Sequence, residues 1–304
     1  MEREWERTVQ YTYITLEDVK NIFQKYNQYE EVLDYELITC GKRNTNYRVT
    51  TTSSKYILRI CSRNSEGYRS ELISYYLLKD KINIPKLLMY SNIGDRVYII
   101  YEYIAGKTLE EVIIDRKMID TIARDMAIMH NTSKEEVTGI KIINYPPFRE
   151  WFHLFLQDDY AKIRLGDNRI DKIHYLSVKY DKEIRAIIEN YSGYIHSDFR
   201  PVNMIITEDG NIYYIDWEFA HYGIRLMDIG QLFRYKEFFS ESLEENFEKS
   251  YNKYSKIELP YDWFKLCKLV DLANPIQLLQ CEHISKVKKQ DLLKLIDEIT
   301  SILI

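Results

Sequence analysis

The order of hydrophobic and polar positions predicts strands in the first hundred residues of the chain. Apolar stretches separated by polar turns occur at residues 35–40, 47–50, 55–60 and 96–103. The first three of these are expected to form a meander, because only short polar turns separate them. Two helices accompany the strands. One follows a capping sequence at 15–18 and places Val19, Ile22 and Phe23 on one face, and the other spans 66–80.

Beyond residue 108 the hydrophobic spacing becomes mostly helical. Apolar residues at Ile122, Met126 and Met129 predict a helix over 119–130, and similar patterns occur at 180–190 and 262–304. The sequence therefore predicts an α+β protein with a sheet lobe followed by a helical lobe about twice as long.

The boundary between these lobes is expected at residues 103 and 104. The first lobe would cover residues 1–103, including a helical extension at 1–34, and the second lobe would cover 104–304.

Composition narrows the class of protein. The chain has 304 residues, of which 45% are hydrophobic and 29% charged, and its net charge of −5 argues against general nucleic-acid binding. No run approaches 18 apolar residues, and no apolar segment follows the charged N-terminus. The four cysteines form no C-x-x-C pair, so buried, reduced thiols are expected. These features predict a cytoplasmic protein that does not contact a membrane.

One segment inside the helical half departs from helical spacing and carries candidate chemistry. Two apolar stretches, 204–207 and 212–215, flank an Asp-Gly turn and predict a β-hairpin. Antiparallel pairing is expected to bring Asn203 beside Asp216, with their Cα atoms about 4.5–5.5 Å apart. Their oxygen atoms suit Mg²⁺, and Asp198 would remain free to accept a hydroxyl proton. The alternative is that Asp198 and Asp216 only cap turns.

These residues resemble the catalytic core of the aminoglycoside phosphotransferase family, small-molecule kinases related to protein kinases. The family pattern His-x-Asp-x-x-x-x-Asn is met by His196, Asp198 and Asn203, and it is followed by Ile-Asp-Trp at 215–217. The resemblance implies a protein-kinase-like fold with a small antiparallel-sheet lobe and a larger helical lobe. It also implies that Asp198 is catalytic, that Asn203 and Asp216 bind Mg²⁺, and that His196 supports the loop.

The resemblance extends to a turn that would cover the nucleotide. Residues 40–49 contain Gly41, Asn44 and Thr45 before Tyr-Arg-Val, as in the family's phosphate-covering turn. The turn has one glycine where protein kinases have three, so it would depend on Asn44 and Thr45. An ordinary hairpin turn would have the same sequence pattern.

Further nucleotide-binding residues are implied by position. Arg59 matches the strand cation that contacts the α- and β-phosphates, although many relatives carry lysine there, and Glu71 matches the helix acid that holds this cation. The alternative for both is a solvated surface charge. The main chain of Glu102 and Ile104 would meet the adenine edge.

Two more residues are given supporting or structural roles. Asp228 matches the aspartate that holds the catalytic loop through backbone N–H groups. His130, at the end of an apolar helix, is expected to be a structural histidine.

The resemblance implies transfer of the γ-phosphoryl group of ATP or GTP to a hydroxyl of a small molecule. An aminoglycoside is the leading acceptor, and the acidity of the chain is compatible with a cationic one. Choline, homoserine and other small alcohols remain alternatives, as does a non-catalytic structural protein of the same fold. The sequence identifies no acceptor-binding residue and no oligomeric state, and a role in antibiotic resistance does not follow from fold and motif.

Overall fold

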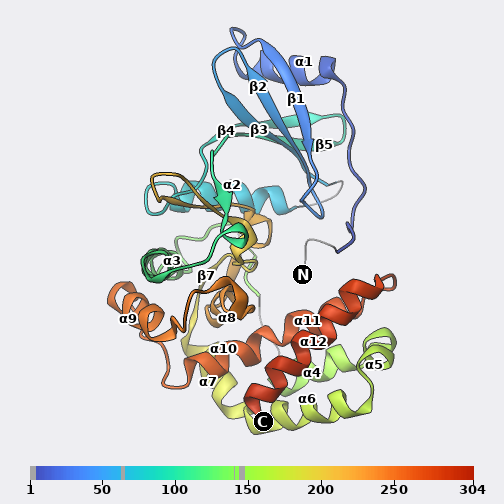
Figure 1. Ribbon diagram of the computed structural model, residues 1–304, viewed down its shortest axis with the longest axis vertical. Helices are drawn as coiled ribbons and strands as arrows, with labels where there is room; N and C mark the ends of the chain where they lie inside the picture. Colours follow the sequence, from blue (N-terminus) through green and yellow to red (C-terminus); the bar gives the residue numbers. More distant parts are fainter. Residues whose placement is uncertain (1–4, 63–65, 140, 144–147) are drawn as a thin grey trace. The chain divides into compact units, whose positions relative to one another are not determined.

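The computed structural model describes residues 5–62, 66–139, 141–143 and 148–304 (Figure 1). Contacts within the chain define two compact units. The sheet unit comprises Arg7–Thr108 and Met204–Phe219, and the helical unit comprises Leu109–Asn203, Ala220–Ile304 and residues 5 and 6.

This division differs from the expected one at three places. Residues 5 and 6 belong to the helical unit, the hairpin segment at 204–219 joins the sheet unit, and the main change of unit falls after Thr108 rather than after residue 103. The last two differences arise because the hairpin extends a short strand at Lys107–Thr108 into a three-stranded sheet.

A five-stranded antiparallel sheet forms most of the sheet unit, with the strand order β1-β2-β3-β5-β4. Its strands are β1 (Val32–Ile38), β2 (Thr45–Thr51), β3 (Lys55–Ile60), β4 (Leu87–Ile93) and β5 (Arg96–Glu102). The predicted strand at 55–60 is confirmed to the residue, whereas β1 begins three residues before its predicted start. The edge strand β4 was not predicted, because it follows a proline and its first three residues are all apolar, without alternation.

Two helices cover opposite faces of this sheet (Figure 1). Helix α1 (Leu16–Tyr26) begins at the predicted Thr15 capping box and packs on the face formed by Tyr56, Leu58 and Ile60. Helix α2 (Gly67–Leu78) packs on the other face, where Ile99 is buried. Because side chains alternate along β3, Arg59 lies on the α2 face. The rest of the predicted 1–34 extension contains no further helix among its described residues.

The predicted hairpin is present, with a different register. Strands β8 (Met204–Ile206) and β9 (Ile212–Tyr214) pair Met204 with Tyr214, so the ladder does not pair Asn203 with Asp216 as expected. Strand β6 (Lys107–Thr108) pairs on the other side of β8. Just before β6, a Cβ on Gly106 would lie 2.3 Å from the carbonyl oxygen of Ile206, so only glycine permits this approach.

The helical unit contains the remaining regular elements. Its α-helices are α3 (Arg116–His130), α4 (Phe148–Leu156), α5 (Asp159–Leu165), α6 (Asp167–Lys179), α7 (Asp181–Asn190), α8 (Leu226–Leu232), α9 (Glu244–Tyr254), α10 (Trp263–Asp271), α11 (Ala273–Leu278) and α12 (Lys286–Leu303). Its 3₁₀ helices are η2 (Leu109–Glu111), η3 (Pro201–Asn203) and η5 (Lys236–Phe238), while η4 (Trp217–Phe219) belongs to the sheet unit. A two-stranded ladder of β7 (Ser192–Ile195) and β10 (His221–Ile224) was not predicted.

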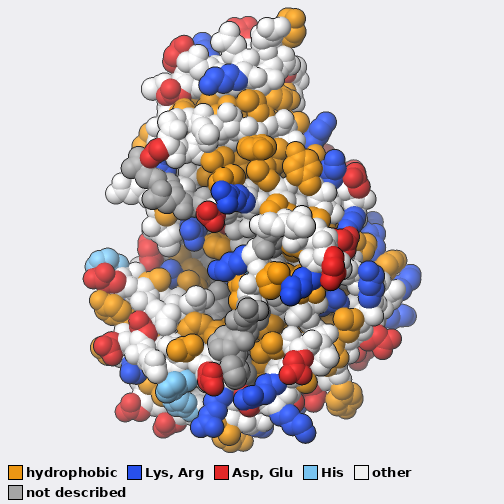
Figure 2. Space-filling model, turned by 180° about the vertical axis from the view of Figure 1, so that it is seen from behind, with side chains coloured by type: hydrophobic (Ala, Val, Ile, Leu, Met, Phe, Trp, Pro, Cys, Tyr) orange, Lys and Arg blue, Asp and Glu red, His pale blue; other side chains and the backbone are white. Residues whose placement is uncertain are grey.

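The predicted apolar face at 119–130 is confirmed, since Ile122, Met126 and Met129 are fully buried in α3. Cys61 and Cys267 are buried as expected, but Cys40 and Cys281 are exposed. Within the described part of the chain, none of the helices has the length and apolar character needed to span a membrane. On the face shown in Figure 2, acidic and basic side chains are interspersed.

Substitution of Gly230 by alanine is predicted to destabilise the protein. A Cβ at this position in α8 would lie 2.5 Å from the carbonyl oxygen of Cys267 in α10, so the two helices would have to move apart. We expect a loss of about 1–3 kcal/mol, measured by urea denaturation. Gly41→Ala is the control, because its Cβ would meet no atom closer than 3.5 Å and its unfolding midpoint should stay at the wild-type value.

Candidate active site

The buried carboxylate of Asp228 holds the loop that follows β7. Asp228, at the start of α8, accepts hydrogen bonds from the backbone N–H groups of His196 and Ser197, each at 2.8 Å. Asp228 is fully buried, so these two bonds compensate for the loss of water around its carboxylate. The supporting contact implied for Asp228 is therefore present.

Gln231 holds the same loop from the next turn of α8 and was missed in the sequence. Its side chain accepts from the N–H of Phe199 at 2.8 Å and donates to the carbonyl of Ser197 at 2.9 Å. The residue lies three positions after Asp228, which places both on one helix face. This i, i+3 spacing is the signal that could have identified it.

The carboxylate of Asp198 is oriented by two neighbours from its own loop. Arg200 donates to it through Nε at 2.5 Å and through Nη2 at 2.8 Å. The Asn203 amide nitrogen donates to the carboxylate and to the carbonyl of Asp198, both at 2.8 Å. The Asp198 carboxylate and the Asn203 amide are thus brought together, and the amide oxygen is the group that Asn203 can offer to a cation. Arg200 was not identified from the sequence, although it lies within the motif.

Two histidines have structural positions near this loop. His196 accepts from the N–H of Asp198 at 3.2 Å through Nδ1, which identifies this nitrogen as unprotonated. His130 is fully buried between the hydroxyl of Tyr251 at 2.7 Å and the carboxylate of Asp228 at 3.3 Å. Burial lowers the pKa of His130, so it is neutral at physiological pH. This agrees with the expectation that His130 is structural.

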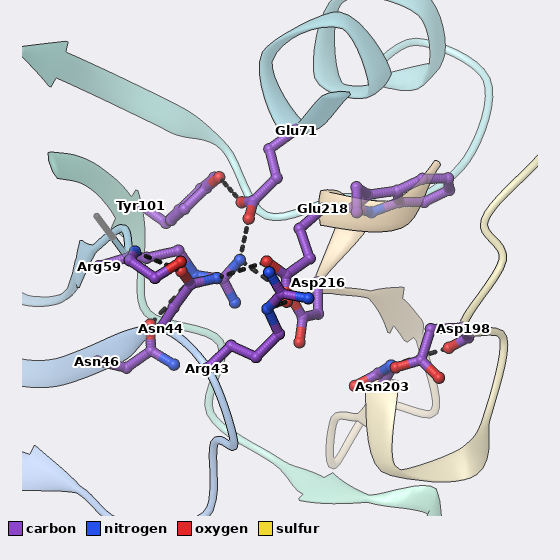
Figure 3. A network of polar contacts seen from close by, with 12 residues as sticks. Arg43, Asn44, Asn46, Arg59, Glu71, Tyr101, Asp198, Asn203, Asp216 and Glu218 are labelled. Atoms are coloured by element: carbon purple, nitrogen blue, oxygen red, sulfur yellow. Dashed lines mark hydrogen bonds and ion pairs between the residues drawn. The ribbon is translucent and has the colours of Figure 1, made fainter. Parts of the chain in front are cut away.

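In the sheet unit, Arg59 joins two carboxylates of different elements (Figure 3). Its guanidinium forms an ion pair with Glu71 of α2 and donates to Asp216 Oδ1 at 3.0 Å, just after β9. The Nε group donates to Asn46 at 3.1 Å, and the Tyr101 hydroxyl donates to Glu71. The ion pair implied by the resemblance is present, and neither Arg59 nor Glu71 is a solvated surface charge.

Burial and charge act in opposite directions on this pair. Burial disfavours the charged form of Arg59, but Glu71 and Asp216 outweigh it and raise the pKa of the guanidinium. Burial also raises the pKa of Glu71 above its usual range, although Arg59 opposes the shift. The backbone of Asp216 has a positive φ of 68°, which is uncommon outside glycine and marks a constrained position.

The turn between β1 and β2 differs from its expected use of side chains. Asn44 donates to Glu218 at 3.2 Å and accepts from the N–H of Ser62 at 3.0 Å. Thr45 is buried and its hydroxyl accepts from the N–H of Thr12 at 2.9 Å. Both side chains therefore hold the turn in place. Gly41 also has an ordinary φ, so its backbone does not require glycine.

The remaining predicted positions are main-chain ones. Glu102 is the last residue of β5, and its carboxylate accepts from the N–H of Lys86 at 2.7 Å. Ile104 lies between β5 and β6, in the connection where the adenine edge is expected.

A further carboxylate, Glu218, lies beside this group and has an altered acidity. It accepts from Asn44, and its Oε1 lies 4.0 Å from the Nε of Arg43. Burial, assisted by the nearby charge of Asp216, raises its pKa to about 7. The environment of Glu218 could not be predicted from the sequence, because it depends on residues that are distant along the chain.

The sequence profile of the phosphotransferase enzyme family, APH, matches residues 34–263. The chain belongs to this family. As a member of this family it is a phosphotransferase, and the suspected family is confirmed.

Individual relatives agree with this assignment. The chain is 29% identical over 226 residues to the LicA homologue of Mycoplasma capricolum subsp. capricolum, covering 73% of this chain and 81% of that protein. Among solved structures, the fold is similar to spectinomycin phosphotransferase APH(9)-Ia, with a TM-score of 0.72, 14% identity and coverage of 96% and 99%. It is also similar to choline kinase LicA from Streptococcus pneumoniae, with a TM-score of 0.67, 19% identity and coverage of 94% and 98%. The expected protein-kinase-like α+β fold is confirmed.

The raised pKa of Glu218 predicts a pH-dependent stability in metal-free buffer. Between the ordinary value of 4.5 and about 7, the folded state binds more protons than the unfolded state. The free energy of unfolding should therefore fall as the pH rises through this window, by on the order of 3 kcal/mol from this residue.

Urea denaturation of wild type and Glu218→Gln at pH 5 and pH 8 measures the effect. Glu218→Gln keeps an oxygen that accepts from Asn44 but carries no charge. Its free energy of unfolding should therefore fall less than that of wild type between pH 5 and pH 8. Equal losses in both proteins would show that Glu218 is ionised throughout.

Proposed function

We propose that this APH protein transfers the γ-phosphoryl group of ATP or GTP to the hydroxyl of a small cationic alcohol. The observation that carries the proposal is the carboxylate of Asp198, which Arg200 orients. It lies on a loop whose backbone is hydrogen-bonded to Asp228 and Gln231. A phosphoryl acceptor needs a positioned base more than a strong one, since positioning and charge neutralisation dominate this reaction.

In the proposed transfer, the acceptor hydroxyl oxygen attacks the γ-phosphorus. The bond from that phosphorus to the β–γ bridging oxygen breaks, and a nucleoside diphosphate leaves. Asp198 orients the hydroxyl and accepts its proton. Arg200 and Asn203 keep the carboxylate in one orientation, because each donates to it.

The residues available for the donor nucleotide carry complementary charge. Arg59 would contact the α- and β-phosphates, with Glu71 keeping its side chain in place. The Asn203 and Asp216 oxygens would hold Mg²⁺, which when bound neutralises phosphate charge. This donor set fits a hard cation that completes its shell with phosphate and water. Among the described residues, no group of three or more His, Cys, Asp and Glu side chains could hold a metal alone.

For the acceptor we propose a choline-like amino alcohol, with an aminoglycoside as the second candidate. The LicA homologue of M. capricolum is 29% identical, and the S. pneumoniae LicA structure is that of a choline kinase. The aminoglycoside expected from the sequence is supported by the similarity to the spectinomycin phosphotransferase, at 14% identity. The intact ion pair of Arg59 argues against a non-catalytic structural protein.

Substitution of Asp198 is predicted to abolish most transfer without unfolding the protein. Asp198→Asn keeps the side-chain shape but cannot accept the hydroxyl proton, so kcat should fall by about 10²–10⁴-fold. Nucleotide turnover with a range of acceptors measures this effect. The matched control is Asp181→Asn, because Asp181 also accepts from an arginine Nε, at 2.8 Å, on exposed helix α7. Wild-type activity in Asp198→Asn would remove Asp198 from the mechanism.

The acceptor class is predicted to emerge from one comparative assay. Wild-type protein is incubated with Mg²⁺, ATP or GTP, and choline, ethanolamine, homoserine, spectinomycin or kanamycin, and phosphorylated products are measured. We expect the highest kcat/KM for choline or another small amino alcohol. Turnover of the aminoglycosides alone would reverse the order of the two candidates.

A further inference from the structure

An arginine outside the expected site residues holds the backbone of the turn between β1 and β2. The Arg7 guanidinium donates to the carbonyl oxygens of Gly41, Arg43 and Asn44, the last two at 2.9 and 3.1 Å. It also lies over the ring of Tyr11, 3.8 Å from the ring centroid. One side chain therefore donates hydrogen bonds to three carbonyl oxygens of a single turn.

The segment around Arg7 adds further contacts to this turn and to β2. The N–H and hydroxyl of Thr8 donate to the carbonyl of Lys42 at 3.1 and 3.2 Å. The N–H of Thr12 donates to the Thr45 hydroxyl, and the Tyr47 hydroxyl donates to the carbonyl of Thr12. The turn is thus held along its length by residues 7–12.

The turn also lacks the usual backbone means of setting its shape. All of residues 41–46 are described, and none has a positive φ. The side chains of Asn44 and Thr45 are occupied in holding the turn rather than free to face a ligand. The orientation of its peptide groups is therefore set by hydrogen bonds from other segments, of which Arg7 makes three to the carbonyls.

This orientation has an electrostatic consequence. In a trans peptide the carbonyl and the following N–H point in opposite directions, and the described chain contains no cis peptide. The carbonyl of Arg43 faces Arg7, so the N–H of Asn44 points away from Arg7. Carbonyl oxygens repel phosphate oxygens, whereas backbone N–H groups attract them.

We propose that Arg7 is a positioning residue for the donor phosphates. Because three carbonyl oxygens of the turn point toward Arg7, the N–H groups that follow them point away from Arg7 and are available to a polyphosphate. This inference rests on the proposed function, because it assumes that the turn covers a nucleotide. It assigns to the N-terminal segment the task that additional glycines would otherwise perform.

The chain provides a matched control for a purely structural role. Arg164 of α5 also donates to three carbonyls, those of Leu279, Cys281 and Glu282, and its guanidinium lies 5.1 Å from the ring centroid of Tyr160. This arrangement belongs to the helical unit and holds the segment after α11. Loss of Arg164 should cost stability in the same way as loss of Arg7, without a specific effect on phosphates.

The test compares binding of AMP, ADP and β,γ-imido-ATP, or the guanine series if GTP is the donor, by calorimetry with Mg²⁺. Wild type, Arg7→Ala, Arg7→Lys and Arg164→Ala are measured. Arg7→Ala should weaken triphosphate binding by about tenfold, ADP by less, and AMP by under about twofold. Arg7→Lys should fall between Arg7→Ala and wild type, because it keeps the charge but has a single donor centre. Arg164→Ala should bind all three like wild type.

Two outcomes would overturn the inference separately from the proposed function. Equal weakening of all three nucleotides by Arg7→Ala, or wild-type binding of all three, would leave Arg7 as a structural contact only. If Arg7→Ala does not fold, Arg7→Lys supports the same comparison. A wild-type protein that binds none of the three would instead overturn the proposed function, and with it the role of Arg7.

Discussion

The buried Arg59 guanidinium, with its carboxylate partners Glu71 and Asp216, is the interaction on which the proposed nucleotide site depends. A charge in this position is tolerated only when partners replace its water, and removing one partner of such a pair typically costs about 3–5 kcal/mol. The partners come from β3, from α2 and from the segment after β9. The requirement to satisfy one cation therefore holds three elements together, and it helps to explain why residues 204–219 belong to the sheet unit.

A similar principle operates in the helical unit, where buried polar side chains fix a backbone that carries the chemistry. Asp228 and Gln231 accept hydrogen bonds from N–H groups of the loop around Asp198, so side chains of the protein itself orient this loop. Neither residue needs to touch a substrate. Preorganisation of this kind lowers the cost of positioning reactants, which is the main requirement of phosphoryl transfer. Arg7 would act in the same way on the turn before β2, through carbonyls instead of N–H groups.

Elements with strong local signals were predicted well from the sequence. The Thr15 capping box, the strand at 55–60 and the apolar face of α3 depend on residues a few positions apart. The family was also identified from the motif of His196, Asp198 and Asn203, which lie within eight residues. The β7–β10 ladder was missed because its strands have only four residues each, and β4 was missed because its apolar start does not alternate. The hairpin register differs from the expected one by one residue, because the turn at 207–211 sets which residues of β8 and β9 pair.

The sequence by itself determined the α+β class, the change from strand spacing to helical spacing along the chain and the family motif at 196–203, because each has a signature within a short window. Only the tertiary structure decided what surrounds those residues. Asn44 donates a hydrogen bond to Glu218, 174 positions later in the sequence, and Arg7 donates to the carbonyl of Asn44, 37 positions later. Contacts between residues so far apart in the sequence leave no local pattern. Burial then gave these groups properties that their residue types do not have in water, including the raised pKa of Glu218.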